Sequence, residues 1–134
     1  MSGGAKNPRR ANGTRRTKLL RRLRAAGGAC WVCRLPVDWG VPHGHPRAGE
    51  CDELVPVSRG GSPYDPANVA PAHRCCNSWR SNRSVAYVGR VRAEVARACG
   101  PWATPEEFVA MARAVERGVA APVSRVPPMV TTKW

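Results

Sequence analysis

The sequence predicts a small α+β protein in which a zinc knuckle stabilises the core and α-helices flank it. Three observations support this fold class. The chain has 134 residues with one Phe and two Tyr, which is enough for one domain with a modest core. Closely spaced cysteines and a histidine indicate a metal site that would stabilise such a core. Two amphipathic patterns with clear start signals predict helices toward the C-terminus.

The formal net charge of +13 is concentrated near the N-terminus, where residues 1–24 carry only basic charges and the first carboxylate of the chain is Asp38. A basic segment of this kind suits a polyanion, so we expect nucleic acid as the partner. The alternative is a solvated tail that only keeps the protein soluble. No apolar run is long enough for a bilayer, and the charged N-terminus is unlike a signal peptide. We therefore expect no membrane association and a cytoplasmic location. The basic residues are nearly all Arg, which indicates a GC-rich bacterial or phage genome and hence a bacterial host cell.

Residues 1–28 are expected to form a basic arm that is partly disordered or helical. Residues 1–13 are rich in Gly, Asn, Pro and Arg, which favours disorder. A helix is plausible from Thr14 to the glycines at 27–28, with leucines 19, 20 and 23 on one side. The basic side chains of this helix that we expect to contact the DNA backbone are Arg15, Arg16, Lys18, Arg21 and Arg22.

Residues 29–83 are expected to contain the chemistry. A Cys-x-x-Cys turn is followed by a loop dense in Pro and Gly over 36–49. Alternation predicts a strand over 50–57, although Pro56 weakens its end. A second Gly-rich loop precedes a short helix over 73–83, and its arginines Arg80 and Arg83 are expected to grip DNA phosphates.

Residues 84–120 are expected to form two helices. Ser84 is placed to cap the first, whose valines make an apolar face and which Gly100 ends. Thr104 as N-cap, Pro105 at the first position and Glu107 predict a capping box for the second. Residues 121–134 are expected to form an extended tail.

The six cysteines need an explanation other than disulfides if the protein is cytoplasmic. Cys30 and Cys33 have the spacing of a zinc knuckle, and His73 and Cys76 would share one face of a helix. These four predict a closed tetrahedral site for a structural Zn²⁺. Cys75 in place of His73 is the main alternative, and four unligated buried residues are a further one.

The segment CDELVPVSRGGSPYDPANVAPAHRCCN contains, in order, an acidic pair on a strand, a Pro-x-Ser-x-Gly-Gly loop, an asparagine and a Cys-Asn pair on a helix. It resembles the HNH endonuclease family and looks most like small phage-encoded members. Over residues 30–83 the resemblance implies a ββα-metal fold and a catalytic Mg²⁺ or Mn²⁺ in addition to the zinc. The matching residues are Asp52, Pro56, Ser58, Gly60, Gly61, Asn68, Cys76 and Asn77.

The resemblance also implies roles. Asp52 and Asn77 would bind the catalytic ion, and Asn68 would hold the loop by hydrogen bonds. Glu53 stands where the family has the histidine that acts as general base. It is our first choice for the base, and it could equally bind the ion.

An imidazole is the alternative base, supplied by His43, by His45, or by His73 if Cys75 replaced it at the zinc. The implied activity is hydrolysis of DNA phosphodiester bonds with little sequence preference. The sequence does not reveal the oligomeric state, and we favour a monomer. The alternative function is a catalytically inactive zinc-ribbon module that binds nucleic acid.

Overall fold

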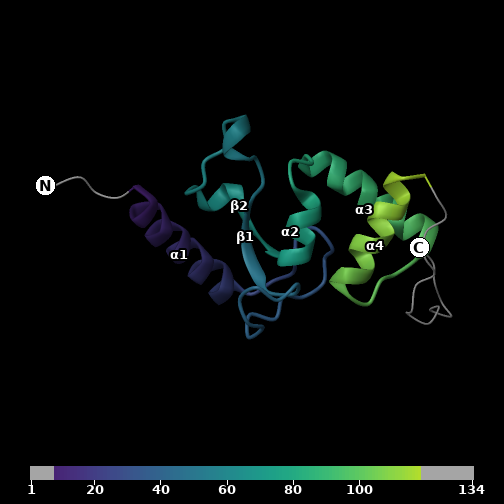
Figure 1. Cartoon of the computed structure of the whole chain (residues 1–134), viewed down its shortest axis with the longest axis horizontal. Coiled ribbons are helices and arrows are strands. Elements are labelled where there is room, and N and C mark those ends of the chain that lie inside the picture. Colours follow the sequence, from purple (N-terminus) through teal and green to yellow (C-terminus); the bar gives the residue numbers. More distant parts are fainter. Residues whose placement is uncertain (1–7, 119–134) are drawn as a thin grey trace, which may run out of the picture.

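The computed structural model describes residues 8–118, with side chains from residue 13 onward. The first residues of the basic arm and the expected tail over 121–134 lie outside this range. The helices and strands form a small α+β fold, as predicted (Figure 1). In chain order the elements are α1 (Pro8–Ala26), β1 (Gly49–Glu53), the 3-10 helices η1 (Val57–Arg59) and η2 (Pro66–Asn68), β2 (Val69–His73), α2 (Arg74–Arg80), α3 (Val85–Cys99) and α4 (Pro105–Glu116).

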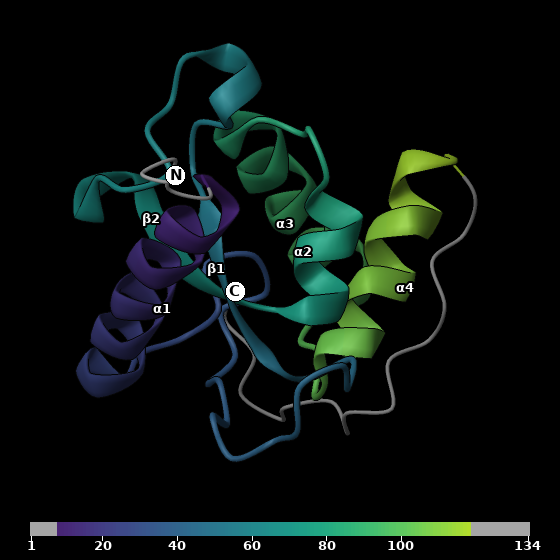
Figure 2. The same cartoon turned by 60° about the vertical axis from the view of Figure 1, so that its left-hand side comes forward.

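The two strands pair in antiparallel fashion, with Glu50 opposite Ala72 and Asp52 opposite Ala70. Helix α1 lies on one side of this sheet and α2 on the other, while α3 and α4 pack beyond α2 (Figures 1 and 2). Strand β1 ends at Glu53, four residues earlier than predicted, because the chain bends at Pro56 into η1. Only the family resemblance had implied β2.

Helix α1 begins at Pro8 instead of Thr14, so the expectation of disorder was wrong for residues 8–13. Proline is well tolerated in the first turn, where its missing N–H is not needed. The helix docks on the sheet through Leu19, which is buried against Cys51 and Val69. The basic arm is therefore attached to the core through an apolar contact.

The main core lies between the cysteine-rich turn, α2, α3 and α4. Trp79 of α2 contacts Phe108 of α4 edge to face, with ring centroids 5.8 Å apart. Val88 and Val95 of α3 are fully buried in the same cluster. This core fixes α2 between the sheet and the C-terminal helices, so the residues of α2 that face β1 have a defined position.

Both C-terminal helices begin where predicted. The Ser84 hydroxyl accepts the N–H of Tyr87, and the Thr104 hydroxyl accepts the N–H of Glu107. The carboxylate of Glu107 reaches back to the N–H of Ala103, one residue before the position that a capping box would use.

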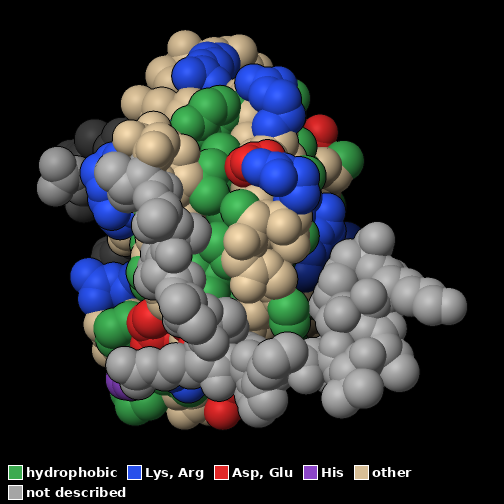
Figure 3. All heavy atoms as spheres, turned by 90° about the vertical axis from the view of Figure 1, so that its right-hand side faces the viewer, with side chains coloured by type: hydrophobic (Ala, Val, Ile, Leu, Met, Phe, Trp, Pro, Cys, Tyr) green, Lys and Arg blue, Asp and Glu red, His purple; other side chains and the backbone are tan. Residues whose placement is uncertain are grey.

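The outer face of α3 and α4 shows hydrophobic side chains between arginine side chains (Figure 3). Among the helices in residues 8–118, none combines the length and apolar character needed to cross a membrane.

Candidate functional site

Four side chains converge at the junction of the cysteine-rich turn, β2 and α2. The ligand atoms of Cys30, Cys33, His73 and Cys76 all lie within 4.8 Å of one another, and all four residues are buried. Three sulfurs and one imidazole nitrogen are a donor set that suits Zn²⁺. The structure thus confirms the predicted cluster as a possible metal site. Cys75, the alternative ligand, is partly exposed and is not part of it.

The imidazole of His73 is held in the orientation that a metal ligand needs. Its Nδ1 lies 3.4 Å from Sγ of Cys33 and 3.9 Å from Sγ of Cys76. Its Nε2 lies 3.0 Å from the carbonyl oxygen of Pro36 and can donate to it, which leaves Nδ1 for the ion. Because both nitrogens are occupied in this way, the alternative role of His73 as general base does not fit the geometry.

The electrostatics of the cluster also suit a bound cation. Hydrogen bonds from Cys33 and Cys76 lower the pKa of the Cys30 thiol in spite of its burial. Burial lowers the pKa of His73, but hydrogen bonds with Cys30 and Cys33 outweigh it and raise the pKa to about 10. Hydrogen bonds to Cys30 raise the pKa of Cys33 and of Cys76. Without an ion the cluster therefore holds one thiolate beside a protonated His73, and binding of Zn²⁺ would release protons from the other ligands.

Helix α3 and the connection between α3 and α4 support the knuckle through its carbonyl groups. Arg92 of α3 donates to the carbonyl oxygens of Val32, at 3.0 Å, and of Trp31, at 3.3 Å. The indole of Trp102 donates to the carbonyl of Cys33 at 2.8 Å. These bonds satisfy backbone groups that a tight, buried turn would otherwise leave unpaired.

The loop between β1 and β2 is closed by Asn68, as the resemblance implied. Its Oδ1 accepts the N–H of Val55, and its Nδ2 donates to the carbonyls of Val55 and Ser62, each at 2.9 Å. A Cβ on Gly61 would lie 1.7 Å from the carbonyl oxygen of Val55, so only glycine fits there. The loop thus keeps the end of β1 in place.

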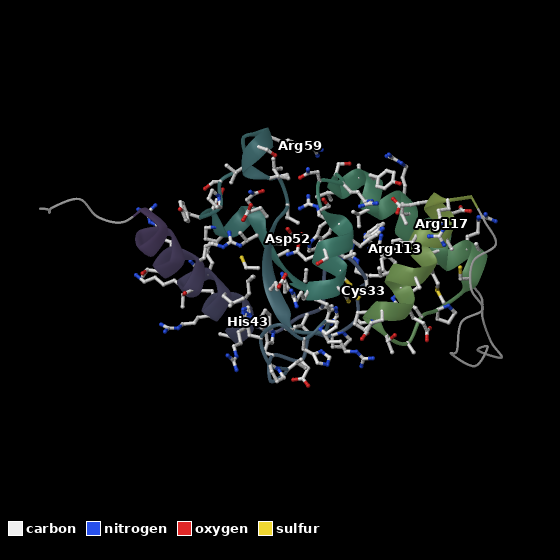
Figure 4. The ribbon with its side chains drawn as sticks, viewed as in Figure 1. Cys33, His43, Asp52, Arg59, Arg113 and Arg117 are labelled. Carbon is white, nitrogen blue, oxygen red and sulfur yellow. The ribbon has the colours of Figure 1, made fainter. Side chains whose placement is uncertain are left out.

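Asp52 lies between β1 and α2, facing inward (Figure 4). Its Oδ2 accepts the indole N–H of Trp31 at 2.8 Å, and Arg80 contacts both oxygens at 3.2 and 3.3 Å. Burial raises the pKa of Asp52, partly offset by these two partners. Asp52 is therefore part of a buried ion pair, and binding an ion would require Arg80 to withdraw.

Arg80, the last residue of α2, and Arg83, three residues beyond it, both form hydrogen bonds within the fold. Arg80 is 1% exposed and also donates to the carbonyls of Glu53 and Leu54, so in this structure its guanidinium is not accessible to a DNA phosphate. Arg83 pairs with Glu116 of α4, at 2.8 Å from Nε to Oε2. Its guanidinium is thereby directed to α4 and not to a free phosphate-binding position.

Helix α1 covers the other face of β1. Arg16 forms an ion pair with Glu53, at 2.5 Å from Nη1 to Oε2, and also donates to the carbonyl of Cys51. Arg15 stacks over the ring of Tyr64. The remaining basic side chains predicted to contact DNA are exposed, and these are Lys18, Arg21 and Arg22.

A cavity of about 600 Å³ lies between α1, β1 and the loop before β1. We call it the α1–β1 groove. Asn77 lines it and donates from Nδ2 to Oε1 of Glu50, at 2.9 Å. The amide of Asn77 thus meets Glu50, whereas the resemblance had paired it with Asp52.

His43 lines the α1–β1 groove, but His45 does not, and the Nδ1 of His45 accepts the N–H of Arg47. Sequence reasoning had missed Glu50. The alternation of β1 offered a clue, because residues two apart in a strand share a face, which places Glu50 on the side of Asp52.

These residues give the protein one closed site that could hold a metal and one open, polar groove beside it. A search of family models, curated proteins and solved structures finds no match to this chain. Its function must therefore be argued from its own residues.

Proposed function

We propose that the protein is a metal-dependent DNA endonuclease of the HNH type. The observation that carries this proposal is the order β1, loop, β2 and α2, with the loop closed by Asn68 and the start of α2 joined to the Cys/His cluster. The HNH resemblance assigns these same segments to a ββα-metal core. In that assignment the zinc is structural, and a second ion, Mg²⁺ or Mn²⁺, supports catalysis.

The proposed reaction is hydrolysis of a phosphodiester bond. The oxygen of a water molecule bonds to phosphorus, the bond from phosphorus to one sugar oxygen breaks, and that oxygen takes up a proton. A bound Mg²⁺ or Mn²⁺ would stabilise the negative charge that develops. Oxygen donors suit such an ion, and the side-chain oxygen of Asn77 with a carboxylate of β1 provides them.

Two residues are candidates for taking the proton from water. Glu53 occupies the position that the resemblance assigns to the base, but its carboxylate is bound to Arg16. His43 lines the α1–β1 groove and is exposed. Glu53→Gln should lower the cleavage rate by roughly 10²- to 10⁴-fold if Glu53 is the base. An unimpaired Glu53→Gln variant with an impaired His43→Ala variant would assign the base to His43.

One observation favours a second function, a catalytically inactive module that binds nucleic acid. Both oxygens of Asp52 are held by Trp31 and Arg80, and Glu53 is held by Arg16. Exposed basic side chains on α1 would still attract DNA without any cleavage.

Zinc-loaded protein incubated with supercoiled plasmid distinguishes the two functions. We expect relaxed or linear product in Mg²⁺ or Mn²⁺ and none in EDTA, and we expect Asn77→Ala to abolish it. Retarded plasmid with no cleavage in any metal would instead support the binding module. If the protein neither cleaves nor retards the plasmid, both functions are contradicted.

A further inference from the structure

The α1–β1 groove brings an acid from β1 and an amide from α2 to one wall of an open cavity. Glu50 and Asn77 come from positions 27 residues apart, and their side chains are 2.9 Å from one another. We propose that this pair binds the divalent cation of the nuclease site, with Glu50 taking the place of Asp52 as the carboxylate ligand. The inference rests on the proposed function and assigns its metal ligand.

Accessibility is the first argument for Glu50. The Glu50 side chain is 32% exposed, and its carboxylate lies 3.8 Å from the guanidinium of Arg74. The Asp52 side chain is 10% exposed and its carboxylate contacts Arg80 at 3.2 Å. An ion can thus reach Glu50 from solvent, whereas reaching Asp52 requires a buried ion pair to separate, which is costly.

The second argument is the chemistry of the pair. A carboxylate and an amide oxygen are hard donors, and two protein ligands leave positions for water and a phosphate oxygen. The amide of Asn77 now donates to Glu50. Rotation by 180° would turn its oxygen toward the same point, so both side chains could bind one ion without movement of the backbone.

The third argument is the composition of the other walls. Arg16 and Arg24 line the groove from α1, and guanidinium groups bind phosphate well. A phosphodiester lying between α1 and β1 would therefore meet arginines on one side and the proposed ion on the other. Arg16 already holds Glu53, so Arg24, whose residue is exposed, is the better placed of the two to take the phosphate.

The fourth argument concerns Trp39. Its ring packs on β1 so closely that a Cβ on Gly49 would lie 2.4 Å from it. Within the described part of the chain, its indole nitrogen is buried and has no hydrogen-bond partner. Trp39 lines the same groove, and an oxygen acceptor could reach this buried donor only if the ring or its neighbours shifted.

Binding of Mn²⁺ to zinc-loaded protein, followed by electron paramagnetic resonance of the free ion, tests the inference without relying on cleavage. We expect wild type to bind one Mn²⁺ per chain in addition to its zinc. Glu50→Gln keeps the size of the side chain and should weaken this binding at least tenfold, as should Asn77→Ala. Asp52→Asn is the matched carboxylate change on the same strand, and it should change the Kd for Mn²⁺ less than twofold.

The outcomes separate the inference from the proposed function. Mn²⁺ binding that depends on Glu50, without plasmid cleavage, supports the cation site and contradicts the nuclease. Cleavage and Mn²⁺ binding that survive Glu50→Gln overturn the cation site and leave the nuclease standing. Absence of Mn²⁺ binding in wild type also overturns it. If Asp52→Asn fails to fold, the comparison of wild type with Glu50→Gln still decides.

Discussion

The Cys/His cluster and the α1–β1 groove each include a residue of α2, yet they differ in almost every physical respect. The cluster is buried, and its ligands point at a single position. The groove is open, and its polar residues come from α1, the loop before β1, β1 itself and α2. The difference teaches that one site serves stability while the other has room for a substrate. Substitutions at the two sites should therefore have different consequences.

The largest effect is expected at the cluster. Cys30→Ser removes a zinc ligand, and structural zinc contributes roughly 10–16 kcal/mol to the folding of zinc-finger peptides. We expect the variant to lose its zinc and its folded core together, as measured by elemental analysis and circular dichroism. Cys99→Ser, a change at a partly exposed cysteine outside the cluster, should keep both. A folded Cys30→Ser protein without zinc would show that the cluster is not the support of the fold.

The next effect is expected at the buried ion pair between the two sites. Arg80→Ala leaves Asp52 buried without its cation, which should cost about 3–5 kcal/mol in the free energy of unfolding by urea. Arg97→Ala is the matched control, because Arg97 pairs with Glu94 on the exposed face of α3. That change should leave the free energy of unfolding almost unchanged, because an exposed ion pair contributes little. Equal costs for the two variants would mean that Asp52 is more accessible than its position indicates.

Glu116 tests the link between α2 and α4 that positions both sites. It accepts hydrogen bonds from Trp79, Arg83 and Tyr87. Burial raises its pKa, but these donors outweigh burial and lower the pKa below the ordinary value. Glu116→Gln should cost about 2 kcal/mol at pH 7, since it weakens bonds to a charged acceptor.

The sign of the pH dependence follows from this lowered pKa. The stabilisation by Glu116 is present above the ordinary pKa of glutamate, about 4.3, and is lost as the pH falls through the lower pKa of the folded state. Between pH 7 and pH 3 the free energy of unfolding by urea should therefore fall less for Glu116→Gln than for wild type. Parallel pH curves for the two proteins would refute the assignment.

Substitutions on α1 test whether its exposed basic side chains bind DNA. Lys18, Arg21 and Arg22 are exposed, so changing all three to Ala should weaken DNA binding about tenfold or more. The slope of log K against log salt should become shallower by about 0.9 for each phosphate that α1 no longer neutralises. Arg113→Ala with Arg117→Ala removes two exposed charges from the far side, near α4 (Figure 4), and should have little effect. Similar reductions in affinity for both variants would mean that only the net charge matters.

The two sites also differ in how much the sequence reveals. The cluster was predicted residue by residue, because Cys-x-x-Cys and His-x-x-Cys spacings constrain local geometry. The starts of α3 and α4 were predicted for the same reason, since capping depends on neighbours in the chain. Asn68 was predicted through the family resemblance.

The groove was not predicted, because it depends on contacts between distant segments. The burial of Arg80 follows from its pairing with Asp52, 28 positions away. The position of Glu53 depends on α1 lying across the sheet, which the leucines of α1 permit but do not specify. Glu50 carries no motif of its own, and its meeting with Asn77 requires the register of β1 against α2.

The smallest effect on stability is expected in the knuckle, at a residue whose backbone conformation is unfavourable. Arg34 follows Cys33 with a φ of 70°, a left-handed conformation that costs a residue with a Cβ about 1–2 kcal/mol. Arg34→Gly removes this cost. It also raises the conformational entropy of the unfolded chain, which lowers stability by about 0.5–1 kcal/mol. The net expectation is a gain of about 0.5 kcal/mol from these two terms, with zinc content unchanged, measured by urea unfolding.

Arg34→Ala is the control for this last change. Burial lowers the pKa of Arg92, and repulsion by Arg34 lowers it further. Both substitutions at position 34 relieve this repulsion, but only glycine also removes the Cβ that makes the left-handed conformation costly. Glycine should therefore stabilise the fold more than alanine does. An equal gain from both variants would assign the cost at this turn to charge and not to backbone conformation.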